Sequence, residues 1–156
     1  YNYGAQNRSR LTEAIRRSVI YASCIMAVGM TIFLTVPHLL LKIFSATDTM
    51  LAVGTPCLRL ISLSFSFAGA CIALGSSFQA LGKSVYSMIN SIVRQLIFLI
   101  PAAFLLAQYG AAAGNSDLVW WSYPIAEIAS LVMTSVFYRR IRRELIAPLP
   151  LNGSES

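Results

Sequence analysis

Long apolar runs alternate with short polar segments along the chain, and only Arg94 and Glu127 place a charge inside a run. The four runs occupy residues 18–37, 60–82, 84–107 and 118–138. A helix of about 20 apolar residues crosses the hydrocarbon core of a bilayer, and only helices satisfy their own backbone groups there. The pattern therefore predicts an all-α polytopic membrane protein with four transmembrane helices, arranged as two antiparallel hairpins.

The segments between the runs have the composition of loops and turns. Residues 38–56 hold charged residues, glycine and proline, which predicts an interfacial loop with a short amphipathic helix around 38–44. Residues 81–84 predict a tight turn, and residues 109–117 predict a loop rich in small residues. The last segment, 147–156, is polar and rich in proline and glycine, so we expect a disordered cytoplasmic tail.

Charged residues are scarce, and their positions are more informative than their number. Charged residues make up 12% of the chain, about half of what soluble domains carry, which argues against a disordered chain or a soluble enzyme. The net charge of +6 comes from short clusters between the runs rather than from one patch, so nucleic acid is not an expected partner. The three cysteines lack metal-binding spacing, and no metal site or cofactor is expected.

The basic residues orient the predicted helices. Nine of the twelve fall on one side of the membrane, while Lys42 and Arg59 fall on the other. The nine are Arg8, Arg10, Arg16, Arg17, Lys83, Arg139, Arg140, Arg142 and Arg143. Because basic residues favour the cytoplasmic side, both ends of the chain are predicted to be cytoplasmic.

Arg94 and Glu127 are the two charges inside predicted spans, where ionisable groups face the protein interior or a wet cavity. Counted from Lys83, Arg94 lies about 16 Å deep, and counted from Arg139, Glu127 lies about 18 Å deep from the same surface. Equal depth on neighbouring helices predicts an ion pair. Two roles stay open: a buried clamp that fixes helix register, or a coupling site at which Glu127 takes up and releases a proton or cation.

Polar side chains near this pair predict a lining for a cavity. Asn90 lies four residues before Arg94 and shares its face, Gln95 follows Arg94, and Gln79 and Ser66 come from the preceding run. Hydrogen bonding between helices is the alternative explanation for these side chains.

Small residues recur every four positions in the second run, at Gly69, Ala73 and Ser77. Such a spacing lets a neighbouring helix approach closely, so we expect a helix-packing face there. Pro101 and Pro124 lie in the third and fourth runs, where each removes a backbone donor and favours a kink.

Several short motifs resemble one known family of transporters. Residues 2–7 read Asn-Tyr-Gly-Ala-Gln-Asn and are followed by basic residues, as after the eighth helix of MATE multidrug efflux transporters. Residues 78–83, then Arg94-Gln95 and Pro101, resemble the tenth and eleventh helices of that family. Residues 120–127 resemble the start of its twelfth helix. Together the motifs are most similar to the bacterial branch of the MepA and DinF types.

The resemblance implies a twelve-helix transporter with two lobes, of which residues 1–146 would supply helices nine to twelve, part of the C-terminal lobe. Such transporters exchange Na⁺ or H⁺ for organic, often cationic, drugs by alternating access, and they are not enzymes. The resemblance thus implies toxic organic cations and the lipid bilayer as partners, and a bacterial inner-membrane location. A missing N-terminal portion of the same chain is also expected, because the sequence opens abruptly on Tyr1.

One departure from the family concerns the coupling ion. Some members carry an acidic cation ligand on the tenth helix, whereas residues 60–82 contain no Asp or Glu. Two other functions stay open. One is a lipid-linked oligosaccharide flippase of related architecture, and the other is a four-helix membrane subunit that does not transport.

Overall fold

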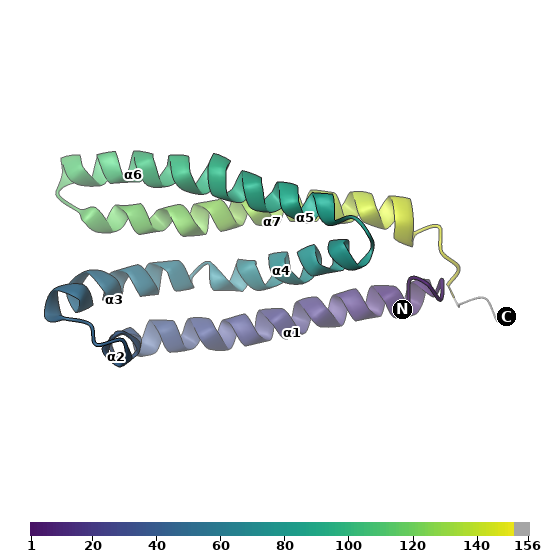
Figure 1. Cartoon of the computed structure of the whole chain (residues 1–156), viewed down its shortest axis with the longest axis horizontal. Coiled ribbons are helices and arrows are strands. Elements are labelled where there is room, and N and C mark those ends of the chain that lie inside the picture. The colour runs from purple at the N-terminus through teal and green to yellow at the C-terminus, as the bar shows by residue number, and fades with distance from the viewer. Residues whose placement is uncertain (152–156) are drawn as a thin grey trace.

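The computed structural model describes residues 1–151, and within that range every regular element is a helix (Figure 1). The longer helices lie side by side along the long axis of the molecule, and the short α2 lies across it at one end (Figure 1). The α-helices are α1 (Arg8–Thr35), α2 (Pro37–Ile43), α3 (Asp48–Ser62), α4 (Phe65–Ala80), α5 (Ser84–Ile92), α6 (Ile100–Ala113) and α7 (Ser122–Ile141). Three short segments complete them: the π-helical η1 (Val93–Leu99) and η3 (Arg142–Ile146), and the 3₁₀-helical η2 (Ser116–Trp121).

Within residues 1–151, two uninterrupted helices are long and apolar enough to cross a bilayer, at Arg8–Thr35 and Ser84–Ala113. The second of these joins α5, η1 and α6. Helices α3 and α4 add a third candidate when they are counted as one broken span, bent by 53°. These helices confirm the predicted all-α membrane architecture, whereas a fourth span, over α7, stays a prediction.

The loop predicted over residues 38–56 is wrong for most of its length. The short helix expected around 38–44 is present as α2, but α3 begins at Asp48 and continues through Pro56. The hydroxyl of Thr47 caps α3 by accepting a hydrogen bond from the Met50 N–H (3.4 Å). Asp48 in the first turn of α3 adds a favourable interaction with the helix dipole. Thr47 and Asp48, which are also common in loops, thus begin a helix here.

The bend between α3 and α4 falls where two serines bond back to their own helix. The Ser62 hydroxyl donates to the Arg59 carbonyl (2.7 Å), and the Ser64 hydroxyl donates to the Ile61 carbonyl (2.6 Å). Such bonds compete with the backbone ladder and bend helices. The second predicted span is therefore two helices that meet at an angle.

The prolines of the third and fourth runs act differently from one another. The helix continues through Pro101, and the turn before it widens into η1, where the Ile100 N–H donates to the Gln95 carbonyl five residues back. Because Pro101 offers no N–H, this widening redistributes the backbone bonds around it. Pro124 lies in the first turn of α7, where a missing N–H leaves no carbonyl unpaired, so the kink expected within the fourth run is wrong.

Both ends of the described chain meet at one end of the bundle, called here the terminal end (Figure 1). A buried apolar cluster holds the helices together there: Leu11, Ile15, Phe78, Leu81, Ile141 and Ile146. The segment after η3 also contacts the start of α1, since the Arg8 N–H donates to the Pro150 carbonyl (3.1 Å). Of the tail predicted to be disordered, residues 152–156 lie outside the described residues.

Candidate functional site

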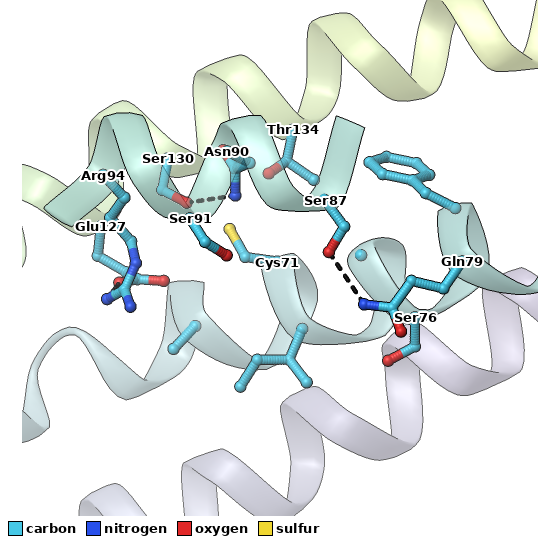
Figure 2. Close-up of a pocket in the computed structure, with 14 residues that line it drawn as sticks. Cys71, Ser76, Gln79, Ser87, Asn90, Ser91, Arg94, Glu127, Ser130 and Thr134 are labelled. Atoms are coloured by element: carbon cyan, nitrogen blue, oxygen red, sulfur yellow. Dashed lines mark hydrogen bonds and ion pairs between the residues drawn. The ribbon is translucent and has the colours of Figure 1, made fainter. Parts of the chain in front are cut away.

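A cavity of about 250 Å³ lies between α4, the α5–η1 helix and α7 (Figure 2). Most of its lining side chains are polar or charged, which is unusual for the middle of an apolar helical bundle. The polar side chains and the thiol that line it are Cys71, Ser76, Gln79, Ser87, Asn90, Ser91, Arg94, Glu127, Ser130 and Thr134.

The structure brings Arg94 and Glu127 together at one side of this cavity. Arg94 Nη1 donates to Glu127 Oε2 at 3.2 Å. The two side chains come from η1 and α7, which pack against each other. The Glu127 side chain is only 8% exposed, whereas that of Arg94 is 37% exposed. A carboxylate buried this far needs a compensating charge, and the guanidinium supplies it.

A second polar contact lies one turn further along the same two helices. Asn90 Nδ2 donates to Ser130 Oγ at 3.0 Å (Figure 2). Asn90 lies four residues before Arg94, and Ser130 lies three residues after Glu127, so the two contacts are adjacent rungs between the helices. The helix interface is therefore held by polar bonds at successive turns.

Two buried polar atoms beside the second rung have no hydrogen-bond partner within residues 1–151. They are the side-chain oxygen of Asn90 and the hydroxyl of Thr134, whose residue is 1% exposed. Both residues line the cavity. Buried polar atoms are normally satisfied, so this part of the cavity has the chemistry to hold a small polar guest such as water.

The sequence-predicted lining is brought together only in part. Gln79 and Asn90 line the cavity with the ion pair, and Gln79 Nε2 donates to Ser87 Oγ at 3.2 Å (Figure 2). Ser66 and Gln95 do not line it. The Ser66 hydroxyl instead contacts the Met30 sulfur of α1 at 3.2 Å, and Gln95 is exposed.

Sequence reasoning missed Ser130, Thr134, Ser87 and Cys71, which also line the cavity. A signal for two of them exists, because Ser130 and Thr134 follow Glu127 by three and seven residues and so share its helix face.

Gly69 lies in the packing contact that α4 makes with α1. A Cβ atom at Gly69 would lie 3.0 Å from the Ala22 carbonyl oxygen and 3.0 Å from Met26 Cγ. Ala73, one turn later, is buried, and the Ser77 hydroxyl donates back to the Ala73 carbonyl (2.8 Å). The predicted small-residue positions thus include one that meets the α1 backbone directly.

The chain is also similar to known proteins in sequence and in structure. The sequence model of the MatE family matches residues 1–105. The multidrug export protein MepA of Staphylococcus haemolyticus is 28% identical over 144 residues, which is 91% of this chain and 30% of that protein. A solved structure titled "protein A" superposes with a TM-score of 0.77 at 31% identity, covering 96% of this chain and 32% of the other. The chain thus spans about a third of the length of these relatives.

Proposed function

The chain belongs to the MatE family, and on that premise we propose that it works as part of a multidrug efflux antiporter. Organic, often cationic, compounds would leave the cell in exchange for Na⁺ or H⁺ by alternating access. The name of the MepA relative supports the substrate class, and the helical membrane architecture is consistent with it. In this proposal residues 1–146 form part of the C-terminal lobe and correspond to helices nine to twelve.

The observation that carries the proposal beyond family membership is the ion pair in the cavity between α4, the α5–η1 helix and α7, called here the central cavity. Burial of a charge among apolar helices is costly, so a carboxylate between α4, η1 and α7 indicates either a contact that fixes helix register or an ionisable group used in transport. We propose that Arg94 and Glu127 first of all fix the register of η1 against α7, since they bond directly and the Asn90–Ser130 rung extends the contact. A lobe that moves as one body needs such fixed contacts.

A coupling role for Glu127 is the second candidate, and the cavity beside the pair favours it. Glu127 contributes a carboxylate to the wall of a space of about 250 Å³, which is large enough for a hydrated cation. When Arg94 moves away, the carboxylate is available to a proton or cation.

We further propose four spans in two hairpins, with both chain ends in the cytoplasm of a bacterial cell and the helices in its inner membrane. The terminal end supports this arrangement, because the start of α1, the α4–α5 turn, and the end of α7 with the η3 segment after it all lie toward it (Figure 1). These segments carry nine of the twelve basic residues. Basic residues favour the cytoplasmic side of membranes.

Dye efflux tests the proposed function. The protein that contains this chain is expressed in cells depleted of their own efflux pumps, and export of several cationic dyes is followed under imposed Na⁺ or H⁺ gradients. We expect export that depends on one of the gradients and stops when that gradient is collapsed. Export of no dye under either gradient, by protein shown to be inserted in the membrane, would contradict the proposal.

A further inference from the structure

A groove lined almost wholly by arginine lies at the terminal end of the bundle. Its volume is about 340 Å³, and Ala147 is the one lining residue that is not arginine. We call it the arginine groove, and its basic residues are Arg8, Arg139, Arg142 and Arg143. It is separate from the central cavity and shares no residue with it.

Helix geometry and chain-end contacts bring these arginines together. Arg139, Arg142 and Arg143 are spaced by three and four residues along α7 and η3, so they share one helix face. Arg8 comes from the start of α1, and its Nη1 donates to the Ala147 carbonyl at 3.3 Å. The buried apolar cluster of the terminal end, including Ile141 and Ile146, fixes the helices beneath. The guanidinium groups therefore stand on a rigid scaffold.

The arginines of the groove lack acidic partners within residues 1–151. The ion pairs of that range are Arg17–Glu13, Arg94–Glu127 and Arg140–Glu144. In the last of these, the hydrogen bond to Glu144 raises the pKa of the Arg140 guanidinium above its usual range. Four like charges around one groove repel one another and attract an anion. Guanidinium groups match phosphate oxygens in a bidentate geometry, so phosphate is the chemistry that fits.

An exposed apolar stripe leads from the arginines along α7 toward the middle of the bundle. Val132 and Val136 are both exposed, and Val136 lines the space next to the groove together with Arg139, Arg143 and the Arg140–Glu144 ion pair. The spacing of these four residues, 132, 136, 139 and 143, follows one helix face. A basic groove continuous with an apolar stripe suits a molecule that has a phosphate at one end and a hydrocarbon chain at the other.

We propose that the arginine groove binds the headgroup phosphate of an anionic phospholipid, whose acyl chain lies along Val132 and Val136. Each arginine near a membrane surface adds attraction for anionic lipid, and basic pockets between helices on the cytoplasmic side bind such headgroups. The proposal goes beyond the efflux activity, and it rests on the cytoplasmic placement of the terminal end proposed above.

The test measures lipid binding by the whole protein that contains this chain. The protein, purified in detergent, is titrated with phosphatidylglycerol or with phosphatidylcholine and followed by native mass spectrometry. The Arg142→Gln/Arg143→Gln variant is compared with Arg10→Gln/Arg17→Gln, which removes the same charge from α1 outside the groove. We expect the groove variant to bind phosphatidylglycerol about 25-fold more weakly, about fivefold per arginine, and the control to change by no more than about twofold.

Three results would overturn the proposal. The first is equal weakening by the two variants, which would indicate a general effect of charge. The second is equal binding of phosphatidylcholine by the unchanged protein. The third is displacement of phosphatidylglycerol by an equal concentration of inorganic phosphate, which would point to a free anion as the ligand. If the glutamine variant unfolds more readily without lipid, Arg142→Lys/Arg143→Lys replaces it. That variant keeps both charges but lacks the bidentate guanidinium geometry, so its preference for phosphatidylglycerol should be weaker than in the unchanged protein, and an unchanged preference would contradict the proposal.

Discussion

Small residues have different roles on the two sides of helix α4. On the side of α1, Gly69 brings the helices so close that a Cβ atom would lie 3.0 Å from the Ala22 carbonyl oxygen. On the side of α5 and α7, Gly75, Ser76 and Cys71 border the central cavity, and the neighbouring helices supply charged and polar groups. The first side forms a close contact between backbones, and the second leaves room for polar chemistry.

The difference shows why a run of small residues has no single meaning in a membrane helix. Close backbone approach stabilises helix pairs in lipid, where no hydrophobic force drives them together. The same lack of bulk on the opposite side leaves the space of about 250 Å³ into which Arg94 and Glu127 extend. The partner helix decides between these outcomes, and the variants below test whether the two sides respond differently.

The largest effect is expected from removing one charge of the buried pair. Arg94→Gln leaves the Glu127 carboxylate, 8% exposed, without its counter-charge, and should lower the free energy of unfolding by about 3–5 kcal/mol. Arg140→Gln is the matched control, because the Arg140–Glu144 pair is exposed and should contribute no more than about 1 kcal/mol. Thermal unfolding in detergent measures both. Equal losses in the two variants would mean that the cavity does not isolate the pair from water.

The next effect is expected at the close contact between α1 and α4. Gly69→Ala places a methyl group against the Ala22 backbone, which cannot rotate away, and should destabilise the protein by about 1–3 kcal/mol. Gly75→Ala is the control on the cavity side, since its Cβ would lie 3.2 Å from the Ser87 hydroxyl, the end of a side chain rather than a backbone atom. Gly75→Ala should leave stability unchanged or raise it by up to about 1 kcal/mol through helix propensity. The reverse order of the two melting temperatures would refute the assignment of the two sides.

The smallest effects are expected at the hydroxyl groups of the cavity. Ser130→Ala removes the acceptor of the Asn90 amide and should lower the free energy of unfolding by about 1 kcal/mol. Thr134→Val replaces a buried hydroxyl without a partner in residues 1–151 and should change it by less than about 0.5 kcal/mol. A loss at Thr134 as large as that at Ser130 would show that the hydroxyl has a partner, such as bound water.

The meeting of Arg94 and Glu127 was predictable from the sequence because axial depth follows from counting. Each residue of a helix adds about 1.5 Å, so two charges counted from the same surface are placed at one level without knowledge of the packing. The structure brings their side chains to 3.2 Å. The widening of the helix into η1 does not disturb this, since it shifts the axial position only locally.

Rotation about the helix axes was not predictable in the same way. Gln95 follows Arg94 by one residue, about 100° around the helix, and therefore leaves the cavity that Arg94 lines. Ser66 lies on the side of α4 that packs against α1, where its hydroxyl contacts Met30. Sequence spacing states which residues share a face, but the neighbours of that face depend on how the helices pack.

The start of α3 shows a second limit of sequence reasoning. Asp48, Gly54 and Pro56 all favour a loop when each is considered alone. In the structure the Thr47 cap begins a helix just before Asp48, and Gly54 allows the side chain of Leu41 in α2 to pack within 2.9 Å of where a Cβ would be. Tertiary contact between α2 and α3 thus overrides the local preference.

Exchange of the two charges decides whether Arg94 and Glu127 act as a pair within a transporting lobe. Gradient-driven efflux of a cationic dye is measured for Arg94→Glu, Glu127→Arg and the variant that carries both changes, each normalised to the amount of protein in the membrane. Glu144→Gln, at an exposed carboxylate, serves as the control. We expect each single change to abolish most of the efflux and the exchanged pair to restore part of it. Efflux by the exchanged pair no better than by the single variants would contradict it.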